Sequence, residues 1–138
     1  MIVLDTNVLS ELMKTKPDRR VVAWLRSQPG ASLYTTSVTQ AEILYGLRLL
    51  PSGKRRKELE SAANEMFDLE FHGRVLSFGS EAAGMFAELA AARRLAGQPI
   101  SQFDAQIAAI TRISAARLAT RNVSDFTGCG LDILNPWA

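Results

Sequence analysis

Four acidic side chains lie at positions where a carboxylate is costly unless it binds a partner. They are Asp5, Glu42, Asp104 and Asp125. Asp5 directly follows an apolar run over 2–4 that is typical of a buried strand. Asp125 lies just past another predicted strand, over 118–120. Glu42 and Asp104 share predicted helix faces with apolar neighbours. Because carboxylates held against a core need a cation, we expect one shared acidic pocket.

The alternative is four unrelated surface acids, with Asp5 acting only as a helix cap. The metal chemistry open to a shared pocket is narrow, because the chain has one histidine, His72, and one cysteine, Cys129. A zinc site of the usual type is therefore excluded, and so is acid–base cleavage by a histidine pair. Oxygen ligands favour Mg²⁺ or Mn²⁺, and a divalent cation would relieve the repulsion among clustered carboxylates.

Strand-like and helical patterns alternate along the chain, which is typical of a parallel sheet with crossover helices. The strands are predicted over 2–4, 32–35, 74–77 and 118–120, with a candidate fifth over 131–134. Helices are predicted from 8, around 21–25, and over 37–50, 54–67, 81–96 and 101–114. Ser37 with Gln40 indicates a capping box, and Ser80 a cap for the helix over 81–96. We expect an α/β fold forming a single domain over 1–138, with the strand ends at one sheet edge.

Composition is ordinary for a globular protein, with 47% hydrophobic and 22% charged residues. No run approaches 18 apolar residues and no secretory signal is evident, so we expect no membrane segment and a cytoplasmic location. A single cysteine fits a reducing compartment. The net charge of +2 is compatible with a polyanionic partner but does not require one.

Several short segments occur in a characteristic order along the whole chain. They are LDTNVLS at 4–10, TSVTQAE at 36–42 followed by YG at 45–46, RLAGQPI at 94–100, DAQIAA at 104–109, ATRN at 119–122, DF at 125–126 and NPW at 135–137. On these segments the chain resembles PIN-domain ribonucleases, and more narrowly the VapC/Fit-type toxins of bacterial toxin–antitoxin modules. The resemblance implies a three-layer α/β/α sandwich around a central, mainly parallel sheet of four to five strands.

The resemblance also implies that Asp5, Glu42 and Asp104 are catalytic and bind one or two Mg²⁺ or Mn²⁺ ions. A fourth acid is implied in the ATRN segment, where some relatives carry Asp and this chain has Asn122. We therefore expect Asp125 to be the fourth catalytic and metal-binding carboxylate, with Asn122 as a neutral polar contact.

Three further positions are expected to assist these acids. Thr6 is expected to orient a ligand or water, and Asn7 either does the same or caps the following helix. Arg121 is a candidate phosphate contact beside the pocket. The basic run Lys54–Lys57 is expected to be a solvated helix start, with contact to RNA phosphates as the alternative.

The implied activity is metal-dependent hydrolysis of RNA phosphodiester bonds, with structured RNA such as tRNA as the expected substrate. The implied partners are a VapB-like antitoxin that silences a growth-inhibiting toxin, a second copy of the chain, and operator DNA reached only through the antitoxin. The alternative is a PIN-like module that binds RNA or protein without cleaving. Phosphoryl-transfer folds that need a second acid after the first strand are disfavoured, because position 7 is Asn.

Overall fold

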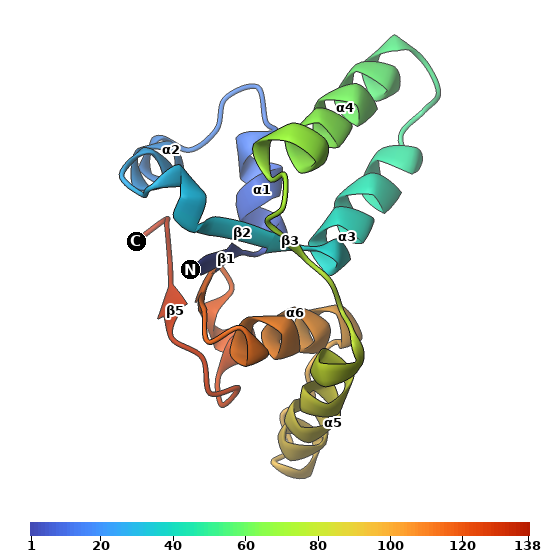
Figure 1. Ribbon diagram of the computed structural model, residues 1–138. Helices are drawn as coiled ribbons and strands as arrows, with labels where there is room; N and C mark the ends of the chain where they lie inside the picture. Colours follow the sequence, from blue (N-terminus) through green and yellow to red (C-terminus); the bar gives the residue numbers. More distant parts are fainter.

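A five-stranded, fully parallel sheet forms the centre of the computed structural model, which describes all 138 residues (Figure 1). The strands are β1 (Ile2–Leu4), β2 (Leu33–Thr36), β3 (Val75–Leu76), β4 (Arg117–Ala119) and β5 (Ile133–Leu134). Their spatial order is β3-β2-β1-β4-β5, so β1 lies in the middle. The predicted α/β class and parallel sheet are confirmed, including the fifth strand.

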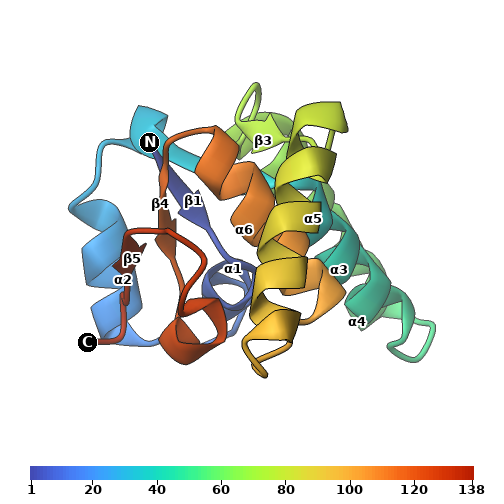
Figure 2. The same ribbon diagram turned by 90° about the horizontal axis from the view of Figure 1, so that it is seen from below.

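Helices cover both faces of this sheet (Figures 1 and 2). They are α1 (Thr6–Leu12), α2 (Arg19–Arg26), α3 (Ser37–Arg48), α4 (Lys54–Glu65), α5 (Ser80–Leu95) and α6 (Gln102–Ile113). Three short segments complete the fold: the 3₁₀ turns η1 (Gly30–Ser32) and η3 (Val123–Phe126), and the π-helical turn η2 (Met66–Glu70) that follows α4. None of the helices combines the length and apolar character that crossing a membrane requires.

The central strand β1 divides the core into two layers because successive side chains point to opposite faces. Ile2 and Leu4 pack with residues of α1 to α4, whereas Val3 packs with residues of α5 and α6. All three side chains are almost fully buried. The continuous apolar run that predicted this strand is thus explained by burial on both faces.

The start of one helix and the caps of two others differ from the sequence predictions. The first helix begins at Thr6, two residues before the predicted Val8, with Asp5 as its N-cap. The N-cap of α3 is Thr36, whose hydroxyl accepts from the Thr39 amide at 3.0 Å, so the predicted Ser37 capping box is wrong by one residue. Ser80 is the first residue of α5 and makes no side-chain cap. At α1 and α3 several hydroxyl or carboxyl groups can accept from the same free amides, whereas the N-cap of α5 is Gly79, which has no side-chain acceptor.

Candidate active site

Asp5 lies at the point in the sheet where the strand order reverses. Strands β2 and β3 are added one after the other on one side of β1, and the chain then crosses back to add β4 on the other side of β1. In open α/β sheets, ligands bind in the crevice outside the strand ends at such a reversal. The Asp5 amide donates to the Ala119 carbonyl at 3.0 Å, which continues the pairing of β1 with β4 and fixes the carboxylate at this crevice.

Neutral donors hold the Asp5 carboxylate in place. The Thr6 amide donates to Oδ1 at 2.8 Å, and the Thr120 hydroxyl donates to Oδ2 at 2.7 Å. The Asn7 side-chain amide donates to the same Oδ2 and to the Thr120 hydroxyl, each at 3.2 Å. Asp5 therefore caps α1 and is also the centre of a hydrogen-bond network joining the ends of β1 and β4.

The segment after β4 is tied to this network through its backbone. The Arg121 amide donates to Asn7 Oδ1 at 3.2 Å, and the Asn122 amide donates to the Thr120 hydroxyl at 3.1 Å. The Arg121 guanidinium carbon lies 5.3 Å from the centre of the Trp137 ring, a cation–π contact that holds this cation beside the C-terminus. Trp137 itself is buried, as expected for a residue that packs the C-terminus down.

Glu42 is connected to the same region by Thr6. The Thr6 hydroxyl donates to Glu42 Oε1 at 2.8 Å and lies 3.0 Å from the Thr39 hydroxyl. Thr6 therefore contacts Asp5 through its own amide and Glu42 through its side chain. One residue, directly after the central strand, sets the relative position of two of the predicted site acids.

Asp104 is in the first turn of α6, whose N-cap is the Ser101 hydroxyl at 3.2 Å from the Asp104 amide. Its side chain is half-buried and close enough to Asp5 and Glu42 to raise the pKa of both. Asp125, in η3, is exposed, but its charge raises the pKa of Asp104. Charge repulsion thus couples all four acids: Asp104 acts on Asp5 and Glu42, and Asp125 acts on Asp104.

Burial is the largest cause of the pKa shifts at this site. The pKa of Asp5 is raised from 3.8 to about 6, mainly by burial and to a smaller extent by the charges of Asp104 and Glu42, while the hydrogen bonds from Thr120 and Thr6 lower it. The pKa of Glu42 and that of Asp104 are also raised, first by burial. None of these three carboxylates forms an ion pair. Mutual repulsion without a paired cationic side chain is what a cation-binding site requires.

The donor set fits Mg²⁺ or Mn²⁺, because it consists of carboxylate, hydroxyl and amide oxygens. As the side chains lie, no three of the acidic, histidine and cysteine side chains form a group that would hold an ion unaided. Mg²⁺ in proteins commonly keeps several waters and is also held by substrate phosphates, so the carboxylates need not enclose the ion by themselves.

Arg93 is an organising residue that the sequence analysis missed. Its buried guanidinium donates to the carbonyls of Gln98 at 2.6 Å, Asp125 at 2.8 Å and Thr127 at 2.9 Å. It thereby joins the end of α5 to the loop that carries Asp125. A signal was present, since Arg93 follows the buried Leu89 by four residues and so lies on the inner face of α5.

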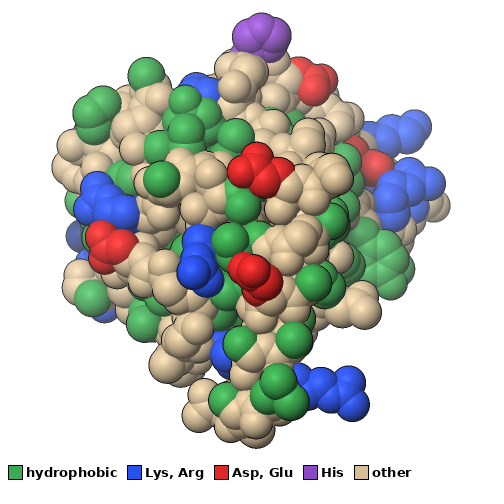
Figure 3. Space-filling model, turned by 60° about the horizontal axis from the view of Figure 1, so that its bottom comes forward, with side chains coloured by type: hydrophobic (Ala, Val, Ile, Leu, Met, Phe, Trp, Pro, Cys, Tyr) green, Lys and Arg blue, Asp and Glu red, His purple; other side chains and the backbone are tan.

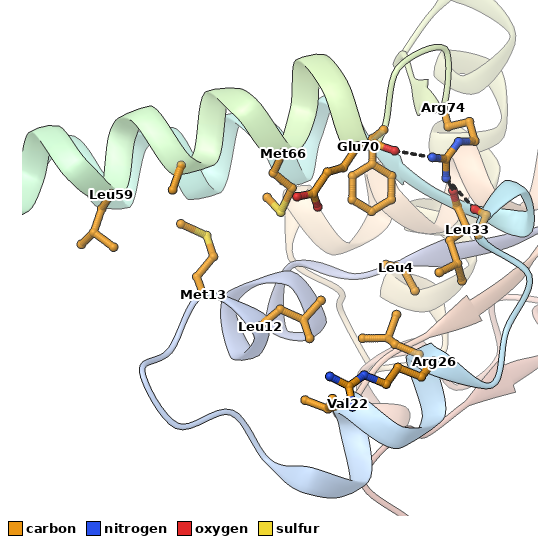
Figure 4. Close-up of a pocket in the computed structure, with 14 residues that line it drawn as sticks. Leu4, Leu12, Met13, Val22, Arg26, Leu33, Leu59, Met66, Glu70 and Arg74 are labelled. Atoms are coloured by element: carbon orange, nitrogen blue, oxygen red, sulfur yellow. Dashed lines mark hydrogen bonds between the residues drawn. The ribbon is translucent and has the colours of Figure 1, made fainter.

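Two clefts in the protein surface differ in character, and only the smaller one is lined by a site acid. An apolar cleft of about 600 Å³ lies between α1, α2, α4 and η2, with Leu4, Val22 and Met66 among its lining residues (Figure 4). A smaller cleft of about 310 Å³ includes Glu42 and Thr6 in its lining. On the side of the molecule toward α5 and α6, acidic and basic side chains are scattered and form no broad basic patch (Figure 3).

Comparisons with known proteins agree with this architecture. A PIN domain model matches residues 2–126. VapC ribonuclease Y4jK of Sinorhizobium fredii is 42% identical over 137 residues, which cover 99% of this chain and 98% of that protein. Toxin FitB of Neisseria gonorrhoeae is 34% identical over 99% of both chains. The solved structure of FitAB bound to the IR36 DNA fragment superposes with a TM-score of 0.94, at 34% identity, over 100% of this chain and 96% of that chain. The chain therefore belongs to the PIN-domain family, among the VapC- and FitB-type toxins of toxin–antitoxin systems.

Proposed function

We propose that this protein is a metal-dependent endoribonuclease that hydrolyses RNA phosphodiester bonds. The observation that carries the proposal is the set of three carboxylates, Asp5, Glu42 and Asp104, whose pKa values are raised at the sheet crevice and which form no ion pair. A PIN-like module that only binds RNA or protein would gain nothing from keeping this repulsive arrangement, because like charges held against a core destabilise the fold.

Asp5, Glu42 and Asp104 would hold Mg²⁺ or Mn²⁺, with Asp125 completing the site from the solvent side. Such an ion lowers the pKa of a bound water and offsets charge on the scissile phosphate. Thr120 and Asn7 keep the Asp5 carboxylate oriented, and Thr6 does the same for Glu42. Asn122, anchored by its amide, offers a neutral side chain at the rim. Arg121 is proposed to contact a substrate phosphate.

The products should carry a 5′-phosphate and a 3′-hydroxyl, because water attacks phosphorus and the ribose 2′-hydroxyl takes no part. The chain has a single histidine, His72, which is exposed and remote in sequence from every site residue. A histidine pair that could deprotonate the 2′-hydroxyl is therefore missing. Mass spectrometry of the fragment ends tests this, and 2′,3′-cyclic phosphates would contradict it.

The decisive experiment compares RNA cleavage by the parent protein and by Asp5→Asn, Glu42→Gln and Asp104→Asn, each with Mg²⁺ or Mn²⁺ and with EDTA. Cleavage should stop in EDTA and in each variant, while circular dichroism shows an unchanged fold. Asp132→Asn is the matched control, because it removes an exposed carboxylate away from the site. Undiminished cleavage in EDTA, or in all three variants, would reject the metal mechanism.

We further propose structured RNA, above all tRNA, as the substrate and growth inhibition through blocked translation as the consequence in the cytoplasm. The support is the family, since the 42%-identical relative is described as a VapC ribonuclease. Sequencing the 5′ ends of RNA fragments after brief expression identifies the target. Ends that map to messenger or ribosomal RNA, with tRNA intact, would replace the tRNA proposal.

The partner that silences the enzyme is proposed to be a VapB-like antitoxin, which also carries the complex to operator DNA. The apolar cleft beside α2 supports this, because its wall of aliphatic side chains suits a segment that folds on binding (Figure 4). A guanidinium from that segment among the carboxylates would compete with the metal ion. Expression alone should arrest growth, and the small protein encoded next to it should restore growth and copurify. Failure of both would reject the toxin role but not the nuclease.

A homodimer is proposed as the working form. Tyr45 and Leu49 lie one turn apart at the end of α3 and are 66% and 67% exposed, an apolar pair that a second copy would cover. Sedimentation of the parent protein measures the oligomeric state directly.

A further inference from the structure

The smaller cleft lies between α1, α3 and α4 and borders one of the site carboxylates, Glu42. Thr6 is also among its lining residues, so a ligand bound beside Glu42 can extend into the cleft without leaving the protein surface. Its volume of about 310 Å³ is at the lower end of the range for sites that hold a small molecule, roughly 300–1,000 Å³. A cleft of this size fits one building block of a chain rather than a folded partner.

Arg55 is the free cation of this cleft. Its neighbours in the Lys54–Lys57 run are engaged elsewhere: Lys54 pairs with Glu58 at 3.8 Å and Arg56 pairs with Glu60 at 3.3 Å. Arg55 lines the cleft and forms no ion pair or side-chain hydrogen bond within the protein. Arg55 thus differs from the rest of the basic run, which was predicted to be a solvated helix start, because it lines a cleft that also borders Glu42.

Lys14 lines the same cleft, but its ammonium group pairs with Glu11 at 2.9 Å. Lys57 also forms no ion pair, yet it lines a different cleft along the outer side of α4. Arg55 and Lys57 therefore have the same charge and lie on the same helix, and only Arg55 borders the cleft that reaches Glu42.

Gly46 lines the cleft and has no side chain to fill it. It lies in the interior of α3, where glycine costs about 0.5–1 kcal/mol relative to alanine. A Cβ atom at Gly46 would meet nothing within 4 Å, so no packing contact requires a glycine. Its backbone has no left-handed conformation either. Gly46 lines the cleft, so its missing side chain leaves space there.

We propose that this cleft is a subsite for the nucleotide next to the scissile phosphate, with Arg55 contacting a backbone phosphate and Gly46 leaving room for the nucleotide. This rests on the proposed ribonuclease function. The charges lining the cleft support it: Glu42 is one of the carboxylates that would hold the cation at the reacting phosphate, and the free guanidinium of Arg55 would contact an adjacent phosphate. A neutral or cationic ligand would gain nothing from Arg55.

The first test measures binding of a short, fluorescein-labelled single-stranded RNA by anisotropy over a salt series, in the Asp104→Asn background so that the RNA stays intact. Arg55→Ala should weaken binding about tenfold, the loss of one charge-assisted hydrogen bond, and reduce the salt dependence by about one phosphate contact. Lys57→Ala removes the same charge from the same helix and should change binding less than about twofold.

The second test fills the cleft without removing charge. Gly46→Leu should raise the melting temperature, because helix propensity improves, and weaken RNA binding by at least the same factor as Arg55→Ala. Gly84→Leu is the matched control, since Gly84 is exposed in the interior of α5, has no atom within 4 Å of the place a Cβ would take, and lines no part of this cleft. It should raise the melting temperature and leave RNA binding unchanged.

Equal effects of Arg55→Ala and Lys57→Ala would overturn the subsite, because the helix would then act only through its overall charge. Unchanged binding by Gly46→Leu would overturn it as well. In both cases the parent protein still cleaves RNA and the proposed function stands. A parent protein that neither binds nor cleaves RNA would instead reject the proposed function and the subsite together.

Discussion

Replacing Asp5 with asparagine is expected to stabilise the metal-free protein at neutral and alkaline pH while abolishing activity. The carboxylate is 4% exposed, and burial raises its pKa from 3.8 to about 6. The folded protein therefore resists an ionisation that the unfolded chain undergoes freely. Asparagine keeps an oxygen for the Thr6 amide but carries no charge to desolvate.

The size and sign of the effect follow from proton linkage. Because the folded pKa of Asp5 is raised, its contribution to stability is fully present below about pH 3.8 and is lost as the pH rises through about 6. Complete loss of this contribution lowers the free energy of unfolding by about 3 kcal/mol, and about half of that loss has occurred at pH 5. The stability advantage of Asp5→Asn over the parent protein should thus grow by about 1.4 kcal/mol between pH 5 and pH 8.

Urea unfolding in EDTA at pH 5 and pH 8 measures the free energy of unfolding of the variant and of the parent protein. Subtracting the two values at each pH cancels the titration of all other groups to first order. Asp132→Asn, an exposed carboxylate, should show no such growth. Adding Mg²⁺ at the higher pH should stabilise the parent protein and leave Asp5→Asn unaffected. An advantage that is equal at both pH values, or a variant that is less stable at pH 8, would refute the reasoning.

Three further outcomes are expected from the same geometry. Thr120→Val removes a hydrogen bond that lowers the pKa of Asp5, so that pKa should rise above 6 and Mg²⁺ affinity at pH 7 should fall about tenfold by calorimetry. Arg93→Met leaves three carbonyls without their donor and should lower the free energy of unfolding by about 2–4 kcal/mol, with faster amide exchange around Asp125. Tyr45→Arg should convert the proposed dimer to a monomer in sedimentation without unfolding it.

Much of the fold could be predicted because its signals are local. Alternation of apolar runs and helical patterns indicates a parallel sheet, and residues 2–4 show by their continuous apolar character that they are buried on both faces. Asp5 was likewise recognisable as a polar residue directly after such a strand. The predicted caps Ser37 and Ser80 are wrong, since α3 is capped by Thr36 and α5 has Gly79 at its N-cap without a side-chain cap. The cap position depends on backbone geometry that tertiary packing decides.

The parts of the site that could not be predicted are its long-range contacts. Thr120 donates to Asp5 across 115 positions of the chain, and the Arg93 guanidinium reaches carbonyls more than thirty positions away. Such pairs have no local periodicity, since they exist only once β4 lies beside β1 and α5 lies beside η3. The carboxylates of the site can be predicted from the sequence, but the full set of neutral hydrogen-bond donors that orient them cannot.

The neutrality of those groups is itself a requirement of the proposed chemistry. Every side chain that hydrogen-bonds to Asp5 or Glu42 is a threonine or an asparagine. A lysine or arginine at Thr120 or Thr6 would orient the carboxylate equally well, but it would also neutralise the charge and occupy the place of the metal ion. Neutral donors fix geometry and leave the repulsion unrelieved, which keeps the acids ready for a divalent cation. A guanidinium inserted by the proposed antitoxin would compete directly with that cation for the same charge.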